Sequence, residues 1–404
     1  MISLLHPILK YNSKTIQFIG SYMNVINFVF TKLGYLLCKV GVKNNIAEIM
    51  KLEDFGYNDK FQKLRVENNL SDFEIGRVIA EHKERYIVKT ENGDYEAEIT
   101  GNLRFSANSR IDFPAVGDWV ALTIYDIDFS VIHKTLPRIS MITRQAVGQI
   151  GEVQIIATNI DYAFIIQALD RDFNINRLER YLTICYSSKV KPIIVLTKTD
   201  LINEQKKAEI IHSIKQRIKD IEVFAISNET HDGYEALKMT IEKGKTYCML
   251  GSSGVGKSTL LNNLSGKTLM RTDSISLSTN KGKHITSHRE LIVLECGVII
   301  IDNPGMREVG ITDTSGGLET TFDRIIRLSL NCKYKDCTHT NEIGCSVIEA
   351  VEKGEIDKKS YENYLKMDRE KAHFESTIEE RRKKEKEFGK MIKNYKKDMK
   401  KNKF

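Results

Sequence analysis

The sequence lacks an unbroken apolar run long enough to cross a membrane. Its most apolar stretch, residues 16–42, is interrupted by Asn24, Asn27, Lys32 and Lys39, whereas a spanning helix needs about 20 consecutive apolar residues. No small-residue cleavage site follows a compact apolar core, which argues against a signal peptide. We therefore expect a cytoplasmic protein without stable membrane association, in which residues 1–49 form a non-essential extension of unknown role.

An even set of cysteines, as a disulfide framework needs, is also missing. The seven cysteines are an odd number, and three of them fall within fourteen residues, which is typical of a metal site in a reducing cytosol. Scattered structural cysteines are the alternative. Together with a nearby histidine, three thiolates suit a closed tetrahedral site for one Zn²⁺. The predicted zinc ligands are Cys332, Cys337, His339 and Cys345.

A net positive charge is missing outside the C-terminal tail. Residues 381–404 contain twelve Lys or Arg against three Asp or Glu, a net +9, whereas the whole chain carries +7, so the preceding residues carry about −2. Basic tails of this kind often lie along nucleic acid, although a solubilising helix has the same composition. The length of 404 residues and the 41% of hydrophobic residues allow two or three globular domains.

Short strands of alternating polarity are predicted between residues 76 and 139. They are separated by turn signals such as Asn92-Gly93 and Gly117-Asp118. Five strands in this length favour a small closed barrel of the OB type, which commonly binds RNA, although an SH3-like barrel leaves a similar pattern. Trp119 lies in one of these strands, where a core position is more common than an RNA-stacking role. The predicted strands are 76–80, 85–90, 95–99, 119–122 and 130–132.

From about residue 155 strands alternate with helices. This alternation is typical of a parallel sheet covered by helices, with ligand loops at the carboxyl ends of its strands. The remainder, from residue 313, is polar and predicted to be helical, with a long Lys/Glu-rich helix from about residue 358 into the tail. The predicted strands are 162–167, 192–196, 222–226, 246–250 and 297–301, and a helix is predicted at 176–187.

One strand-loop-helix segment has the pattern of a phosphate-binding loop. The glycine-rich residues 251–259, here called the phosphate loop, follow the predicted strand 246–250 and precede a helical segment, as the Walker A pattern requires. Backbone N–H groups of such a loop surround phosphate oxygens. Lys257 should bridge the β- and γ-phosphates, and the Ser258 hydroxyl should bind Mg²⁺. The loop consists of Gly251, Ser252, Ser253, Gly254, Val255, Gly256, Lys257, Ser258 and Thr259.

A second nucleotide-binding element follows about fifty residues later. The predicted strand 297–301 ends at Asp302-Asn303-Pro304-Gly305. The Asp302 carboxylate can hold Mg²⁺ through water, and the Gly305 N–H can contact the γ-phosphate as the loop switches.

A base-recognition loop, residues 197–200, precedes both elements. It consists of Thr197, Lys198, Thr199 and Asp200 and follows the predicted strand 192–196. Asp200 can accept hydrogen bonds from the N1–H and 2-amino group of guanine, whereas adenine has no donors on that edge. A buried carboxylate left unpaired there discriminates by roughly 10⁴-fold, which favours GTP over ATP. Ser227, after the strand 222–226, is predicted to supply backbone contacts to the base. A plain surface loop is the alternative.

The order of these elements predicts a circularly permuted GTPase, because the base-recognition loop comes before the phosphate loop. With this order, residues from about 52 to 365 closely resemble the RsgA (YjeQ) family of small-subunit-dependent ribosomal GTPases. The matching motifs are Val116-Gly117-Asp118-Trp119, Leu136-Pro137-Arg138, the segment Asn-Ile-Asn-Arg-Leu-Glu-Arg-Tyr at residues 174–181, Lys281-Gly282-Lys283-His284, residues 302–308 and the cysteine cluster.

The resemblance implies a GTP hydrolase that acts in late maturation of the small (30S) ribosomal subunit. It implies binding of GTP/GDP, Mg²⁺ and one Zn²⁺, stimulation by the subunit, and contacts of the barrel and zinc domains with its rRNA. We expect a monomer. A nucleotide-gated rRNA-binding module with little hydrolysis is one alternative, and a permuted GTPase of the large subunit is another.

Some positions depart from the family pattern. The base-recognition loop usually begins with Asn or Thr, so Thr197 is a tolerated variant, which we expect to weaken nucleotide binding rather than to change its specificity. The switch of the family reads Gly-Lys/Arg-His-Thr-Thr-Thr, whereas Ile285 and Ser287 replace its first and third Thr. The resemblance therefore assigns the Mg²⁺-linked switch hydroxyl to Thr286.

Catalysis also needs a different water-positioning group. Met306 stands where many GTPases have a Gln, and a thioether cannot orient water. The resemblance makes His284 the candidate, beside Lys257 and Thr286 as the other catalytic residues. A structural role for His284 in the switch is the alternative.

The expected fold is a multidomain α/β architecture in four parts. These are the extension 1–49, an OB-fold-like RNA-binding barrel at 50–139, a circularly permuted GTPase domain at 140–312, and a helical zinc-binding domain with a basic tail at 313–404.

Overall fold

The computed structural model describes six segments of the chain. These are residues 51–82, 85–145, 153–170, 173–267, 289–302 and 316–375, together with residues 380 and 383. Several predictions lie outside these residues: the extension 1–49, the switch with His284 and Thr286, Gly305, and nearly all of the basic tail.

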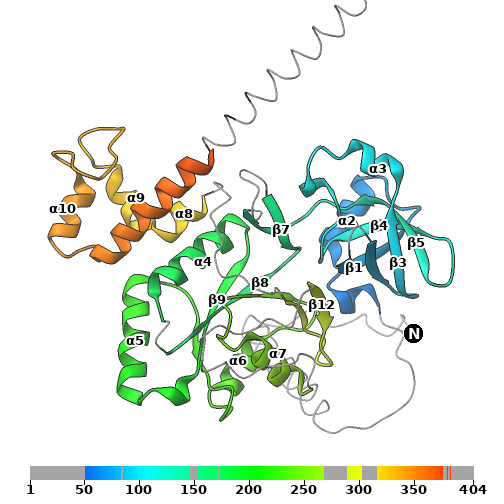
Figure 1. The fold of residues 1–404 in the computed structure, drawn as a ribbon, viewed down its shortest axis with the longest axis horizontal. Helices are drawn as coiled ribbons and strands as arrows, with labels where there is room; N and C mark the ends of the chain where they lie inside the picture. The colour runs from blue at the N-terminus through cyan, green and yellow to red at the C-terminus, as the bar shows by residue number, and fades with distance from the viewer. Residues whose placement is uncertain are drawn as a thin grey trace, which may run out of the picture. The chain divides into compact units, whose positions relative to one another are not determined.

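The first part is a five-stranded barrel (Figure 1). Its strands are β1 (Glu74–His82), β2 (Arg85–Thr90), β3 (Gly93–Ile99), β4 (Trp119–Ile124) and β5 (Phe129–Thr135). They pair in the order β1-β2-β3-β5-β4, and β4 pairs back with β1, which closes the barrel. The five predicted strands are therefore confirmed. The closed Greek-key order, with a parallel β3–β5 pair, favours the OB type over an SH3-like barrel.

The barrel interior follows from the alternation of its strands. In β3, exposed and buried residues alternate because successive side chains point to opposite faces of the sheet. Trp119 is fully buried and packs against Tyr57 and Phe61, with ring centroids 4.9 and 5.7 Å away. These two rings come from the segment with η1 (Leu52–Phe55) and α2 (Asp59–Glu67). Trp119 is thus a core residue, as predicted.

The second part is built on a mainly parallel sheet. Its strands, in spatial order, are β10 (Val223–Ala225), β9 (Lys191–Thr197), β8 (Tyr162–Ala168), β11 (Thr246–Leu250), β13 (Ile299–Asp302) and β12 (Glu290–Val293). The first five run parallel, as predicted. The sixth strand, β12, was not predicted and runs antiparallel to β13. Ala80 of β1 pairs with Glu290 of β12, so the barrel and the sheet share one hydrogen-bonded ladder.

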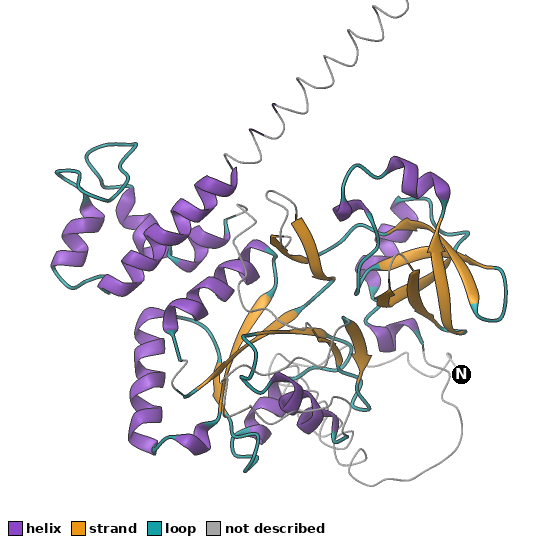
Figure 2. Ribbon diagram, in the orientation of Figure 1, coloured by secondary structure: helices purple, strands orange, loops and turns teal. Residues whose placement is uncertain are grey.

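Helices cover both faces of this sheet (Figure 2). Apolar residues of α4 (Ile175–Ser187) and α5 (Glu204–Arg217) pack on one face, and those of α6 (Tyr234–Thr240) and α7 (Lys257–Ser265) on the other. Burial on both faces explains why the strands are near-continuous apolar runs. A hairpin of β6 (Met141–Gln145) and β7 (Val153–Thr158), which was not predicted, precedes β8.

The third part is helical, as predicted. It contains the helices α8 (Gly317–Thr321), α9 (Asp323–Ser329) and α10 (Ser346–Glu352), followed by a helix at residues 358–375. The buried Glu179 carboxylate of α4 accepts hydrogen bonds from Arg217 and from Asn363 of that last helix, each at 2.7 Å. Such a buried pair needs all its partners, because an unpaired buried charge is costly. Within the described residues, no helix is both long and apolar enough to cross a membrane.

Candidate functional site

The base-recognition loop and the phosphate loop meet at one edge of the sheet. Strands β9 and β11 lie on either side of β8 and run parallel to it, so their carboxyl ends face the same edge. At the end of β9, the Thr197 hydroxyl donates a hydrogen bond to the carbonyl of Val255, with 2.6 Å between the oxygens. Thr197 is fully buried. Two segments 58 residues apart in the chain therefore contact each other directly.

Glycines shape the phosphate loop at two close approaches. A Cβ at Gly251 would lie 2.5 Å from the carbonyl oxygen of Ile166 in β8, which leaves no room for a side chain. Gly256 has φ +94° and precedes the first turn of α7. L residues rarely adopt this left-handed conformation, whereas glycine does so without steric cost. The loop can therefore turn sharply from β11 into α7.

Lys257 lies against the phosphate loop itself. Its ammonium donates to the carbonyls of Gly251 and Ser252 at 2.9 and 2.8 Å, and the residue is 9% exposed. Burial lowers the pKa of Lys257 to about 8, although the nearby Asp302 opposes this shift. Asp302 is buried at the end of β13, which pairs with β11. A buried cation and a buried carboxylate thus lie at the same edge of the sheet.

Asp200 is held by Ser227. The Ser227 hydroxyl donates to the Asp200 carboxylate at 2.6 Å. Asp200 itself is exposed in η3 (Thr199–Leu201), beyond the end of β9, whereas strong discrimination between guanine and adenine needs a buried carboxylate. A bound guanine base would therefore have to shield the Asp200 carboxylate from water. Both backbone groups of Ser227 are engaged, since its N–H donates to Asp232 and its carbonyl accepts from His231. The predicted backbone contacts of Ser227 would compete with these bonds.

The other predicted residues lie nearby or outside the described segments. Lys198 has φ +59° and forms an ion pair with Asp170 at 2.8 Å. Thr199 is buried. Ser258 and Thr259 are half-buried in the first turn of α7, Ser253 is half-buried and Gly254 is exposed. Gly305, His284 and Thr286 lie outside the described residues.

Two neighbours of the phosphate loop were missed from the sequence. Arg177 on α4 donates to the Ser252 hydroxyl at 3.4 Å. It lies in the family-matching segment 174–181, but no role was assigned to it there. Asn228 donates to the carbonyl of Gly256 at 3.1 Å. Its place directly after Ser227, at a strand end that points to the same edge, was the available signal.

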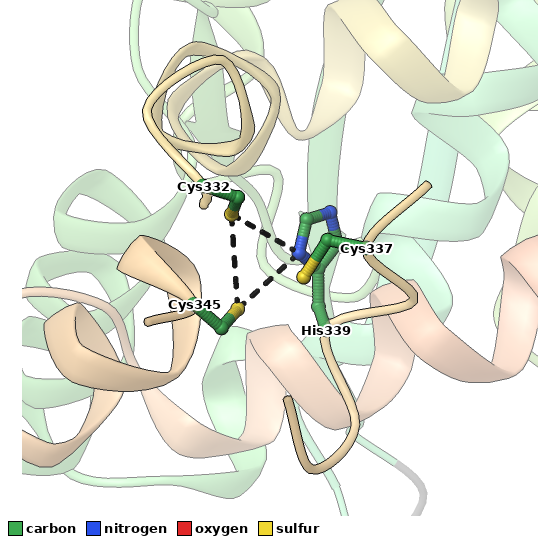
Figure 3. Close-up of side chains that lie close together, drawn as sticks. All are labelled: Cys332, Cys337, His339 and Cys345. Atoms are coloured by element: carbon green, nitrogen blue, oxygen red, sulfur yellow. Dashed lines mark hydrogen bonds between the residues drawn. The ribbon is translucent and has the colours of Figure 1, made fainter. Parts of the chain in front are cut away.

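The four predicted zinc ligands form one cluster (Figure 3). Their ligand atoms all lie within 4.8 Å of one another. The Sγ atoms of Cys332 and Cys345 are 3.8 Å apart, and they lie 3.6 and 3.4 Å from Nδ1 of His339. Tetrahedral zinc with its usual bond lengths requires about 3.8 Å between two sulfurs and about 3.5 Å between sulfur and nitrogen. The donor set therefore fits zinc.

The loop around His339 presents its Nδ1 to the thiols. His339 has φ +58° and is buried, and the Tyr361 hydroxyl donates to its carbonyl. The Glu342 carboxylate accepts from the backbone N–H groups of Thr338 and Thr340 at 2.7 and 2.9 Å, which closes the turn. Burial lowers the pKa of His339, which favours the neutral imidazole that a metal needs.

The other described cysteines take no part in this cluster. Cys185 of α4 and Cys248 of β11 are fully buried in the same apolar core, and burial raises the pKa of both thiols. Cys296 is exposed in the turn between β12 and β13. Among the described residues, the cluster of possible metal ligands therefore consists of the four predicted residues.

Comparisons with known proteins cover most of the chain. The family model described as RsgA GTPase matches residues 135–312. The protein named small ribosomal subunit biogenesis GTPase RsgA 1 from Bacteroides thetaiotaomicron is 38% identical over 343 residues, which are 85% of this chain and 96% of that protein. Its namesake from Listeria innocua is 41% identical over 326 residues, 80% of this chain and 90% of that protein.

Solved structures have a similar fold. YjeQ from Thermotoga maritima matches with a TM-score of 0.55 and 24% identity, covering 76% of this chain and 98% of that one. YloQ, described as a circularly permuted GTPase, matches with a TM-score of 0.52 and 25% identity, covering 77% of this chain and 96% of that one.

Proposed function

Because this chain belongs to the RsgA family of GTPases, we propose that it binds GTP between the base-recognition loop and the phosphate loop and hydrolyses it when docked on the small (30S) ribosomal subunit. The step would belong to late maturation of that subunit. One observation carries the proposal: the Thr197 hydroxyl donates to the Val255 carbonyl. This bond places a loop suited to guanine beside a loop suited to phosphate, although their order in the chain is reversed.

Each end of the nucleotide has suitable groups. Asp200 would accept the two donors of the guanine edge, and the buried ammonium of Lys257 would bind the β- and γ-phosphates. The carbonyls that now hold Lys257 can be exchanged for phosphate oxygens, which interact more strongly with a cation.

Mg²⁺ would be held at the same edge of the sheet. Ser258 lies in the first turn of α7 after β11, and Asp302 ends the neighbouring β13, so an oxygen ligand from each lies near the phosphate loop. Thr286 would add the switch hydroxyl and Gly305 an N–H to the γ-phosphate. The ion would supply neutralisation of phosphate charge. His284 would orient the attacking water, because Met306 cannot.

The remaining assignments concern domains and partners. We assign residues 50–139 to the barrel, 140–312 to the GTPase domain and 313–404 to the zinc domain with its tail. Cys332, Cys337, His339 and Cys345 would hold one Zn²⁺. The barrel, the zinc domain and the basic tail would contact rRNA, and such contacts are salt-sensitive because they release counterions. We propose a cytoplasmic monomer.

Turnover measurements test the proposed function. We expect multiple turnover of GTP but not ATP, slow alone and faster with purified small subunits, because only guanine offers donors to Asp200. Large ribosomal subunits should not stimulate GTP turnover. Phosphate release measured with each nucleotide, with and without each separated subunit, gives the answer. Equal turnover of ATP, or no stimulated turnover at all, would contradict the proposal.

Two variants test the separate roles of Asp200 and His284 in the same turnover assay. Asp200→Asn replaces one hydrogen-bond acceptor by a donor. The variant should bind GTP more weakly and XTP more tightly, because the base of XTP has a carbonyl in place of the 2-amino group. His284→Ala should abolish most of the subunit-stimulated rate while GTP still binds. If stimulated turnover of His284→Ala equals that of the wild type, His284 does not position the water.

The pKa of Lys257 predicts proton uptake on nucleotide binding. Burial lowers this pKa to about 8, so at pH 8.5 much of the ammonium has lost its proton. Phosphate oxygens favour the charged form and raise the pKa again. We expect binding of GDP to take up roughly half to one proton at pH 8.5, and affinity to fall as pH rises above 8. Calorimetry in buffers of different ionisation enthalpy measures the uptake.

Lys257→Arg is the matched control, because a guanidinium keeps its proton throughout this range. Uptake should disappear in this variant. Equal uptake by both proteins would assign the proton to another group.

A further inference from the structure

A network of side chains lies behind the phosphate loop. Asn228 follows Ser227 just beyond the end of β10, and its Nδ2 donates to the carbonyl of Gly256 at 3.1 Å. Its Oδ1 accepts from the Tyr234 hydroxyl of α6 at 2.6 Å. The amide of Asn263 in α7 donates to the Tyr234 oxygen and to the Asn228 carbonyl, each at 3.0 Å. Three elements thus meet at the point where the phosphate loop becomes α7.

The direction of these hydrogen bonds is determined. The Asn263 amide supplies a hydrogen to the Tyr234 oxygen, so the Tyr234 hydroxyl hydrogen points to Asn228. Burial raises the pKa of Tyr234 to about 12, so the hydroxyl keeps this hydrogen at neutral pH. The amide of Asn228 must therefore turn its oxygen to Tyr234 and its NH₂ group to Gly256.

Thr197 and Asn228 hold two successive carbonyls of the phosphate loop. Thr197 donates to Val255 at 2.6 Å, and Asn228 donates to Gly256. The Gly256 carbonyl also accepts the N–H of Leu260, in the first turn of α7. A Cβ at position 256 would lie 2.4 Å from Nδ2 of Asn228, so the amide packs directly on the loop backbone.

One side chain cannot supply both bonds here. The hydroxyl of Thr197 has a single hydrogen, and its bond to Val255 uses it. A second donor has to come from elsewhere, and Asn228 of the neighbouring strand end provides it. The threonine at the start of the base-recognition loop and the asparagine after Ser227 therefore act as a pair.

Holding these carbonyls orients the N–H groups that follow them. A peptide unit is planar and trans, so its carbonyl and its N–H point in opposite directions. With the carbonyls of Val255 and Gly256 turned toward β9 and β10, the N–H groups of Gly256 and Lys257 turn away from those strands. In a phosphate loop these N–H groups are the ones that surround phosphate oxygens.

We propose that Asn228 is a positioning residue of the nucleotide site. It holds the Gly256 carbonyl so that the N–H of Lys257 faces the phosphates, and Tyr234 and Asn263 keep its amide in the required orientation. This inference rests on the proposed binding of guanine nucleotides. Because Asn228 acts on the phosphate loop, its loss weakens GDP and IDP equally, although IDP lacks the 2-amino group that Asp200 would recognise.

Substitution of Asn228 tests the proposal. Asn228→Asp keeps the oxygen for Tyr234 but removes the donor to Gly256, and Asn228→Ala removes the donor without adding charge. Loss of one hydrogen bond at a binding loop corresponds to about tenfold in affinity. We expect calorimetry to give about tenfold weaker binding of GDP and of IDP for both variants, with an unchanged ratio between the two nucleotides.

Tyrosine variants provide the controls. Tyr234→Phe removes the hydroxyl that orients the amide, so GDP binding should weaken by about threefold, with no further loss when it is added to Asn228→Ala. Tyr162 is the first residue of β8 and lies at the opposite end of that strand from the two nucleotide-binding loops. Tyr162→Phe removes a hydroxyl that donates to the Glu242 carboxylate. Its affinity for GDP should equal that of the wild type.

The outcomes separate this inference from the proposed function. A wild-type protein that binds no GDP would contradict the proposed function. If the wild type binds GDP and both Asn228 variants bind within twofold of it, only the role of Asn228 is overturned. A changed ratio of GDP to IDP affinity would also overturn it, because Asn228 would then recognise the base. If thermal melting shows that an Asn228 variant is unfolded, the role of Asn228 is judged by the same criteria from the GDP and IDP affinities of Tyr234→Phe.

Discussion

Lys257→Ala should lower subunit-stimulated GTP turnover by roughly a hundred- to a thousandfold. Removing one group that stabilises developing charge in a water-poor site typically costs this much. The Lys257 ammonium is the buried cation of the phosphate loop, and the buried Asp302 is its neighbour. Phosphate release at saturating small subunits measures the turnover, and calorimetry with GDP measures the accompanying loss of affinity.

Lys245→Ala is the matched control. Lys245 precedes β11, at the other end of the strand that leads into the phosphate loop, and forms a half-exposed ion pair with Asp161 at 3.7 Å. Exposed pairs contribute little, so turnover should stay near that of the wild type. If Lys257→Ala retained turnover within threefold of the wild type, the assignment of the phosphate loop would be wrong.

Cys345→Ala should reduce bound zinc from about one ion per chain to nearly none and make residues 316–375 accessible to protease. Cys345 is a buried member of the four-residue cluster, and its Sγ also accepts the N–H of Ile348 at the start of α10. Structural zinc contributes on the order of 10 kcal/mol to small zinc modules. The loss should be smaller here, because this part also has an apolar core and the Asn363 contact with α4. Metal analysis and limited trypsin digestion measure both effects.

Cys296→Ala serves as the control, because Cys296 is exposed and lies outside the cluster. It should keep its zinc and its resistance to protease. Chelation of zinc from the wild type should reproduce the Cys345→Ala digestion pattern. Full zinc content in Cys345→Ala, or unchanged digestion after complete zinc removal, would contradict a structural metal site at these residues.

Sequence reasoning was most accurate where the signal is local. The glycines, Lys257 and Ser258 all lie within residues 251–259, directly after an apolar strand, so strand, loop and helix could be placed together. The cysteine cluster was likewise visible because its four ligands lie within fourteen residues. The parallel strands followed from apolar runs that are buried on both faces.

Predictions that depended on contacts between distant segments were less complete. The antiparallel strand β12 and its pairing with the barrel were not predicted, because nothing local to residues 290–293 specifies a partner. Asp200 was expected to be buried but lies exposed beyond the end of β9. The backbone of Ser227 was expected to be available, yet Asp232 and His231 already engage it.

The sequence by itself determined which chemical groups this protein has and their order along the chain: a base-recognition loop, then a phosphate loop, then four zinc ligands. Only the tertiary structure decided which of these groups meet. Thr197 reaches Val255 because β9 and β11 flank β8, and Asn228 reaches Gly256 because β10 adjoins β9. Residue patterns specify short-range backbone geometry, whereas the order of strands in a sheet depends on packing of the whole core, which no local pattern contains.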